Sequence, residues 1–239
     1  MESETPGPAR MTPRSLAAMI DHTFLKPYGG PADIERLCRE AREHGFAMVA
    51  INPAEVTRCK RLLEGSPVHV GAAIGFPLGQ STAEVKAYET RDALDRGADE
   101  IDMVINLRAL QAGDETLVRG EIASMARACR AAGAVSKVIL ETCYLTDPQK
   151  MRVCQIAVDE GADFVKTSTG MGTAGATVAD VALMRSAVGD RAGVKAAGGI
   201  RTLATALALI EAGATRLGTS NGVAILEELS TRTLLNGEP

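Results

Sequence analysis

A short recurring pattern constrains the fold of this chain more than any other feature. Helical stretches end in Gly-Ala-Asp at 97–99 and 161–163 and in Gly-Ala-Thr at 213–215, and a short apolar run follows each of them. His44-Gly45-Phe46 occupies the equivalent place near the start. Glycine at such a position can take the left-handed conformation that closes a helix. Repeated helix–glycine–strand units predict successive β–α modules and a parallel sheet.

Eight short apolar runs are the expected strands, and stretches of helical length follow them. The strands are expected at 19–21, 47–51, 68–74, 100–105, 136–141, 164–167, 193–196 and 216–218. The helical patterns begin near residues 31, 53, 82, 108, 147, 178, 202 and 221. Eight such modules in about 220 residues predict one α/β domain, a closed (β/α)8 TIM barrel. An open doubly wound sheet is the less favoured alternative, because no Gly-x-Gly-x-x-Gly follows the first strand.

The two ends of the barrel domain can be placed from local signals. Thr12-Pro13 has the form of a helix N-cap followed by proline in the first turn, so a short N-terminal helix is expected there. Residues 1–11 are polar and Pro-rich and are expected to be a disordered tail, with the barrel domain at 12–235. The N-terminus lacks the apolar stretch of a signal peptide, and no run of about 18 apolar residues is present to span a membrane. A cytoplasmic location is therefore expected.

Charge and composition exclude several classes of function. The net charge of −4 argues against general nucleic-acid binding, which needs a basic surface. The five cysteines show no Cys-x-x-Cys spacing, which argues against a disulfide framework or a zinc cluster and fits a reducing compartment. The three histidines are dispersed, so neither a metal site nor a cofactor is expected. A small molecule is the expected partner, and a homodimer is compatible with the sequence.

Two lysines at strand ends are the first candidates for chemistry. Only seven of the 26 basic residues are lysine, and two of them, Lys166 and Lys195, lie at the carboxyl ends of the sixth and seventh strands. Adjacent strand ends are neighbours in a barrel, and catalytic groups lie at that end. Two close ammonium groups and burial both disfavour the charged form, so one amine can be neutral near pH 7 and attack a carbonyl. In the alternative interpretation each lysine reaches solvent or pairs with a carboxylate.

Asp102 is the candidate acid–base group. Glu100, Asp102 and Val104 share one face of the fourth strand, and a buried carboxylate there needs a partner such as a lysine from another strand. Asp102 then either moves protons or only neutralises that lysine. Glu100 is expected at the surface, where the strand starts, and Lys137, which opens the fifth strand, is expected at the opposite end of the barrel.

Glycine-rich loops predict an anion site at the same end of the barrel. Gly198 and Gly199 follow the seventh strand, Gly218-Thr219-Ser220 follows the eighth, and each loop precedes a helix. Barrels frequently bind phosphate there, with backbone amides and a helix N-terminus. Thr169-Gly170 is expected to add a third edge. Asp21 closes the first strand, and its carboxylate is expected to face the pocket mouth, while His22 is expected to be a hydrogen-bonded structural residue.

Six segments together resemble the deoxyribose-phosphate aldolase family. The resemblance extends from about Leu16 to Glu227, and its matching segments are IDHTFLKP (20–27), IGFPLG (74–79), GADEIDMVIN (97–106), VKTSTG (165–170), VKAAGGIR (194–201) and GTS (218–220). It implies a class I aldolase that cleaves 2-deoxy-D-ribose 5-phosphate to D-glyceraldehyde 3-phosphate and acetaldehyde without metal, in deoxynucleoside catabolism in the cytoplasm. The partners implied are this sugar phosphate and acetaldehyde.

The same resemblance implies roles for individual residues. Lys166 matches the Schiff-base lysine, Lys195 the second lysine that lowers its pKa, Asp102 the proton-relay acid and Asp21 a polar pocket residue. Phosphate-loop positions are matched by Gly199, Gly218 and Ser220. The chain departs from the family in two places: it lacks the C-terminal tyrosine of some members, and it has Asn221 where a small Ser or Gly is expected. A different class I aldolase, a sugar-phosphate sensor and a barrel isomerase remain as alternatives.

Overall fold

The structure is a computed structural model that describes residues 11–235, and its strands form a closed parallel barrel in sequence order, from β1 to β8 and back to β1. The strands are β1 (Ile20–Phe24), β2 (Met48–Ile51), β3 (His69–Ile74), β4 (Glu100–Val104), β5 (Val135–Ile139), β6 (Phe164–Lys166), β7 (Gly193–Ala197) and β8 (Arg216–Thr219). The predicted TIM barrel is confirmed, and each predicted strand lies within three residues of its observed bounds.

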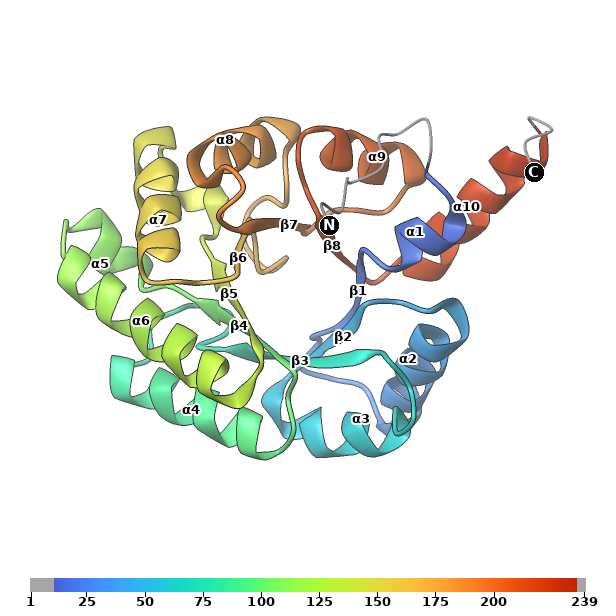
Figure 1. Ribbon diagram of the computed structural model, residues 1–239, viewed down its shortest axis with the longest axis horizontal. Coiled ribbons are helices and arrows are strands. Elements are labelled where there is room, and N and C mark those ends of the chain that lie inside the picture. Colours follow the sequence, from blue (N-terminus) through green and yellow to red (C-terminus); the bar gives the residue numbers. More distant parts are fainter. Residues whose placement is uncertain (1–10, 236–239) are drawn as a thin grey trace.

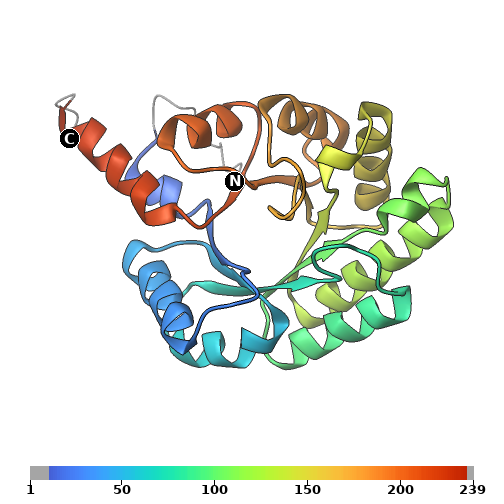
Figure 2. The same cartoon turned by 180° about the vertical axis from the view of Figure 1, so that it is seen from behind.

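The helices surround the strands, as both views of the ribbon show (Figures 1 and 2). They are α1 (Pro13–Ala17), α2 (Pro31–His44), the 3-10 turn η2 (Pro53–Glu55), α3 (Val56–Leu62), α4 (Ala83–Asp95), α5 (Leu107–Gln111), α6 (Glu115–Ala132), η3 (Thr142–Tyr144), α7 (Asp147–Asp159), α8 (Val178–Val188), α9 (Leu203–Glu211) and α10 (Gly222–Leu235). The single helix expected from residue 108 is two helices, because Asp114 caps a new helix with its side chain. The predicted disordered tail, 1–11, lies outside the described residues except for Met11, which is buried.

The recurring Gly-Ala-Asp pattern does two things in the structure. Gly97 and Gly161 have φ angles of 100° and 77°, in the region that favours glycine, and each ends a helix. The aspartates that follow clamp the neighbouring strand: Asp99 accepts a hydrogen bond from the Val70 amide at 2.8 Å, and Asp163 accepts one from the Ser136 amide at 2.8 Å. The pattern therefore closes each helix and fixes the amino-terminal rim of the barrel.

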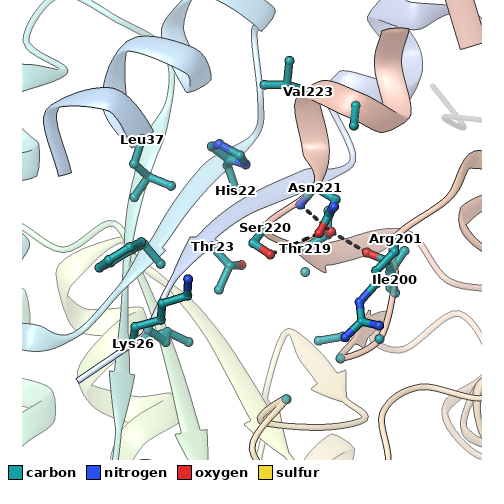
Figure 3. Close-up of a pocket in the computed structure, with 18 of the residues that line it drawn as sticks. His22, Thr23, Lys26, Leu37, Ile200, Arg201, Thr219, Ser220, Asn221 and Val223 are labelled. Atoms are coloured by element: carbon teal, nitrogen blue, oxygen red, sulfur yellow. Dashed lines mark hydrogen bonds between the residues drawn. The ribbon is translucent and has the colours of Figure 1, made fainter. Parts of the chain in front are cut away.

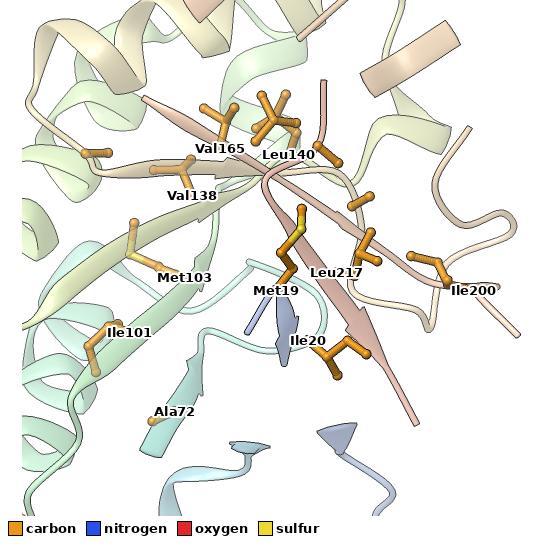
Figure 4. Close-up of a cluster of buried hydrophobic side chains, with 14 of the residues drawn as sticks. Met19, Ile20, Ala72, Ile101, Met103, Val138, Leu140, Val165, Ile200 and Leu217 are labelled. Carbon is orange, nitrogen blue, oxygen red and sulfur yellow. The ribbon is translucent and has the colours of Figure 1, made fainter. Parts of the chain in front are cut away.

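The apolar core lies between the strands and the helices, not inside the barrel. Side chains on the outer faces of the strands are fully buried there, including Ile101, Met103, Val138, Val165 and Leu217 (Figure 4). The inner faces carry charge instead, since strand register places Lys166 beside Lys195 and Asp102 beside Lys137.

Among the helices in the described residues, we find none with the length and apolar character needed to cross a membrane.

Candidate active site

Asp102 is the centre of a buried group of charges inside the barrel. One carboxylate oxygen accepts hydrogen bonds from Nζ of Lys166 at 2.8 Å and Nζ of Lys195 at 2.7 Å. The other oxygen accepts a hydrogen bond from Nζ of Lys137 at 2.9 Å. All four residues are at most 3% exposed. The structure thus brings together the three residues that the sequence singled out for chemistry, and it adds a third lysine.

A second tier of charges lies below this group and is joined to it. Asp21 pairs with Lys195 at 2.5 Å and with the guanidinium of Arg216. Arg216 also reaches Glu100 at 3.1 Å, and Glu100 pairs with Lys137. The seven residues of this network come from six strands. Each charge therefore has a partner from another strand, as buried charges require.

Three expectations about this tier were wrong. Glu100 is not at the surface but fully buried, because Lys137 and Arg216 compensate its charge. Lys137 does not lie at the far end of the barrel; it is the third residue of β5, and register places it opposite Asp102. Asp21 does not face the pocket mouth but is 0% exposed beside Lys195 and Arg216. In each case the interior contains enough opposite charge to bury a group that would otherwise stay in water.

Apart from His69, whose half-exposed ring lies 2.8 Å from Glu100, the network contains one cation more than it has anions. Its carboxylates are Asp21, Glu100 and Asp102, and its bases are Lys137, Lys166, Lys195 and Arg216. An uncompensated charge in a low-dielectric interior is costly, and an amine can avoid this cost by losing its proton. The three-to-three balance is reached when one lysine is neutral.

Lys166 is the base whose environment favours the neutral form. Burial, followed by repulsion from Lys195 and Lys137, outweighs attraction to Asp102 and lowers the pKa of Lys166 to about 8. Burial alone would raise the pKa of Asp102, but the charges of Lys137, Lys166 and Lys195 hold it well below its usual value. Burial also opposes the charge of Lys137, but Asp102 and Glu100 keep the pKa of this lysine above its usual value. An amine with a pKa of about 8 thus lies beside a carboxylate whose pKa is held well below its usual value.

A pocket of about 740 Å³ opens above Lys166 at the carboxyl ends of the strands. Its lining includes seven of the predicted substrate-binding residues, Thr169, Gly170, Gly198, Gly199, Gly218, Thr219 and Ser220. Lys26 and Arg201 also line it, and they lie on opposite sides of the pocket (Figure 3). Arg36 and the carboxylates Asp33, Glu40 and Glu227 line it as well, so charges of both signs face the pocket.

The loops after β7 and β8 are held together so that their backbone faces the pocket. The Thr219 hydroxyl donates to the Ile200 carbonyl at 2.7 Å and accepts from the Asn221 amide at 2.9 Å (Figure 3). Gly199 has a φ of 77°, a conformation that other residues rarely adopt. Within residues 11–235, the amides of Gly199 and Ile200 donate no hydrogen bond to the protein. These free donors form the kind of cradle that binds a phosphate.

The remaining polar residues near the pocket have other partners. His22 is 3% exposed, and its Nε2 lies 2.7 Å from the Glu40 carboxylate, so the expected structural hydrogen bond is confirmed. Lys86 is buried against Glu121 at 2.5 Å, away from the pocket. Cys143 is half-buried, and its Sγ lies 4.0 Å from a carboxylate oxygen of Glu141.

Comparison with known proteins identifies the family. The sequence profile of the DeoC/LacD family of aldolases matches residues 15–228. The chain belongs to the DeoC/LacD aldolase family. It is therefore a carbon–carbon lyase, as expected from the sequence. Among its relatives, the deoxyribose-phosphate aldolase of Bacteroides thetaiotaomicron is 65% identical over 92% of each chain, and that of Thermococcus gammatolerans is 53% identical over 91% of this chain and 97% of the relative.

The fold comparison agrees with the family assignment. A deoxyribose phosphate aldolase from Aeropyrum pernix, described as tetrameric, superposes with a TM-score of 0.86 at 37% identity over 93% of each chain. This DeoC/LacD aldolase thus shares both its barrel and its sequence with enzymes of that name. The buried lysine–aspartate group and the glycine loops described above are the features from which its chemistry can be argued.

Proposed function

We propose that this aldolase reversibly cleaves 2-deoxy-D-ribose 5-phosphate to D-glyceraldehyde 3-phosphate and acetaldehyde through a Schiff base on Lys166. One observation carries the proposal: Lys166, with a pKa of about 8, lies in the same pocket as the glycine loops whose amides are free to bind a phosphate. A covalent amine catalyst and a phosphate cradle in one cavity match a phosphorylated aldehyde substrate.

The proposed reaction begins at the substrate carbonyl. The neutral amine of Lys166 attacks C1 of the open-chain sugar, and loss of water from the carbinolamine gives an iminium. A base removes the proton of the C3 hydroxyl, the C2–C3 bond breaks, and its electron pair moves to the iminium to form an enamine. Glyceraldehyde 3-phosphate leaves. Protonation of the enamine at C2 and hydrolysis of the resulting iminium release acetaldehyde and return the amine.

Asp102 and Lys195 are proposed to transfer the protons together. Their atoms are 2.7 Å apart, and both lie next to the nucleophile, so a proton can pass between them and the substrate through one water. The carboxylate of Asp102 also stabilises the positive iminium that replaces the neutral amine. Asp21 is proposed to assist indirectly, because it holds Lys195 from below at 2.5 Å.

The phosphate group is proposed to bind at the loops after β6, β7 and β8. Gly170, Gly198, Gly199, Gly218 and Ser220 line this part of the pocket, and α10 begins immediately after it at Gly222. A helix N-terminus favours an anion. Thr169 and Thr219 are proposed to act as loop supports, because their hydroxyl groups hydrogen-bond to Glu141 and to Ile200.

We further propose a cytoplasmic enzyme of deoxynucleoside breakdown that assembles at least as a homodimer. The relative from Aeropyrum pernix, described as tetrameric, supports an assembly larger than a monomer. Light scattering coupled to gel filtration gives the mass of the assembly directly, and a mass near 25 kDa would contradict this part of the proposal.

Borohydride trapping tests the proposed reaction. The protein is incubated with 2-deoxyribose 5-phosphate, reduced with borohydride and digested, and the modified peptide is located by mass spectrometry. An N-ethyl group on Lys166 is expected, because the two-carbon iminium is reduced in place. A longer adduct obtained only with a ketone donor would indicate a different class I aldolase. Absence of any lysine adduct from folded protein would overturn the covalent mechanism.

A further inference from the structure

Glu141 has a backbone conformation that is unusual for a residue other than glycine. Its two sequence neighbours, Leu140 and Thr142, hydrogen-bond to the backbone of Lys166 and Thr167. Glu141 follows β5 at the carboxyl end of the barrel, and its φ of 55° is the only positive φ at a non-glycine residue in the range 11–235. Its side chain is 2% exposed. A non-glycine residue in the left-handed region costs roughly 1–2 kcal/mol, and it persists where the surroundings hold it there. The contacts of its side chain show what holds it.

The carboxylate of Glu141 is bonded to one residue of the loop after β6. The Thr169 amide donates to its two oxygens at 3.2 and 3.3 Å, and the Thr169 hydroxyl donates to it as well. The same hydroxyl oxygen accepts the Met171 amide at 3.0 Å. A Cβ added at Gly172 would come within 3.1 Å of the carboxyl carbon, so the loop also packs directly on this side chain. Glu141 thereby fixes the turn at 169–172.

The backbone on either side of Glu141 holds the end of β6. The Leu140 amide donates to the Lys166 carbonyl at 2.9 Å, and the Thr142 amide donates to the Thr167 carbonyl at 2.9 Å. Two backbone hydrogen bonds therefore connect the end of β5 to the segment that begins with Lys166. The hydrogen bonds between the Glu141 carboxylate and Thr169, which we call the latch, add a side-chain connection. Because both donors of Thr169 are taken by Glu141, the Gly170 amide between Thr169 and Met171 is the nearest one left free to face the pocket.

We propose that Glu141 is a positioning residue for phosphate: its latch on Thr169 sets the turn that presents Gly170 to the phosphate of the substrate. The left-handed backbone aims the carboxylate across the gap between β5 and β6. A glycine at 141 would adopt this backbone without the steric cost but would lose the hydrogen bonds to Thr169. This inference rests on the proposed function for the identity of the sugar, but not for the binding of phosphate itself.

Two variants break the latch from its two ends. Glu141→Gly removes the carboxylate while permitting the same backbone, and Thr169→Val removes the hydroxyl. Thr90→Val is the matched control, because Thr90 is also fully buried and its hydroxyl donates only to its own helix, outside the pocket. Glu141→Gln keeps one carbonyl acceptor for the Thr169 donors and is expected to recover part of what Glu141→Gly loses.

The first readout is the affinity for inorganic phosphate, measured by titration calorimetry on each folded variant. We expect Glu141→Gly and Thr169→Val each to weaken phosphate binding about tenfold and the double variant to be no weaker than either one, because residues in one contact act non-additively. Thr90→Val is expected to leave the affinity unchanged. Unchanged affinity in Glu141→Gly, or additive losses in the double variant, would overturn the proposal.

The second readout is the ratio of kcat/KM for 2-deoxyribose 5-phosphate to that for unphosphorylated 2-deoxyribose. The variants are expected to lower this ratio about tenfold, mainly through KM for the phosphorylated sugar. Equal losses on both sugars would indicate a merely structural role and would contradict the inference. A wild-type protein that binds phosphate but cleaves neither sugar would remove the proposed function while leaving the calorimetric test of Glu141 intact.

Discussion

Replacing Lys195 by methionine is expected to move the pH dependence of the reaction. Methionine keeps most of the side-chain volume and removes the charge. Nζ of Lys166 and Nζ of Lys195 lie 2.8 and 2.7 Å from the same oxygen of Asp102. The two nitrogens are therefore at most ~5.5 Å apart, and at an effective dielectric constant of ~20 two such charges repel by about 3 kcal/mol. This repulsion corresponds to about two pKa units.

The size of the effect follows from the fraction of neutral amine. The pKa of Lys166 is about 8, so at pH ~7.5 roughly one quarter of the molecules have the reactive form. Without the charge of Lys195 we expect a pKa near ~10 and a neutral fraction of roughly 0.3%. The value of kcat/KM at pH ~7.5 is then expected to fall by about two orders of magnitude from this cause alone.

The assay is kcat/KM for cleavage between pH ~6 and ~10.5, which reports the ionisation of the free enzyme. The wild-type profile is expected to rise through about 8, and that of Lys195→Met through ~10. Lys195→Arg keeps the charge, so its profile is expected to rise near the wild-type value even when its plateau is lower. Lys150→Met, which removes a lysine paired with Asp180 between α7 and α8, is the matched control. A Lys195→Met profile that still rises near 8 would refute the electrostatic reasoning.

Three further predictions follow from the same contacts. Asp102→Asn leaves three buried cations without their shared partner, so we expect a loss of roughly 3–5 kcal/mol in urea unfolding and a fall in kcat of at least ~10²; an active, fully stable variant would contradict the network. Gly199 and Gly133 have φ angles of 77° and 70°, and a Cβ added at either would meet no atom within 4 Å, so alanine at each is expected to lower the free energy of unfolding by about 1–2 kcal/mol. Only Gly199→Ala is expected to raise KM for the sugar phosphate. Equal KM values in the two variants would exclude the glycine loop from phosphate binding. Burial alone would raise the pKa of Glu100, but contacts with Lys137, His69 and Arg216 hold it below its usual value. The stabilisation from Glu100 is therefore present above its pKa in the unfolded chain and is lost as pH falls through its pKa in the folded protein. Glu100→Gln is expected to flatten the acid side of the curve of unfolding free energy against pH.

The barrel could be predicted from the sequence because its signals are local. Gly97 and Gly161 close helices whatever lies around them, and the apolar runs that follow have the length of a strand. The break between α5 and α6 was missed, although Gly113 and the capping residue Asp114 are a local signal that could have found it. The strand ends differ by a few residues because hydrogen bonding to neighbouring strands, and not composition, decides where a ladder stops.

The depth of side chains inside the barrel could not be predicted, because it depends on register between strands that are distant in sequence. Lys137 lies opposite Asp102 only because β4 pairs with β5 in the observed register. Glu100 is buried because Lys137 from β5 and Arg216 from β8, 116 residues away, both pair with it. The left-handed backbone of Glu141 likewise has no signature in the residue type. A signal for the burial of Glu100 was nevertheless present, because Glu100 and Asp102 alternate onto the same face of β4, so an inward Asp102 implies an inward Glu100.

The charge count of the network gives a reason why its second tier exists at all. With Asp102, Lys166 and Lys195 alone, two cations would face one carboxylate, and hydration by water from the pocket would stabilise the extra positive charge. Asp21 and Glu100 add two negative charges, and Lys137 and Arg216 add two positive ones, so these four residues change the geometry without changing the excess of one cation. These four residues add rigidity. Lys137 holds Asp102 in place, and Asp21 holds Lys195 in place, so neither Asp102 nor Lys195 can move to compensate the extra positive charge. The excess must then fall on the amine that faces the open pocket, and that amine is Lys166.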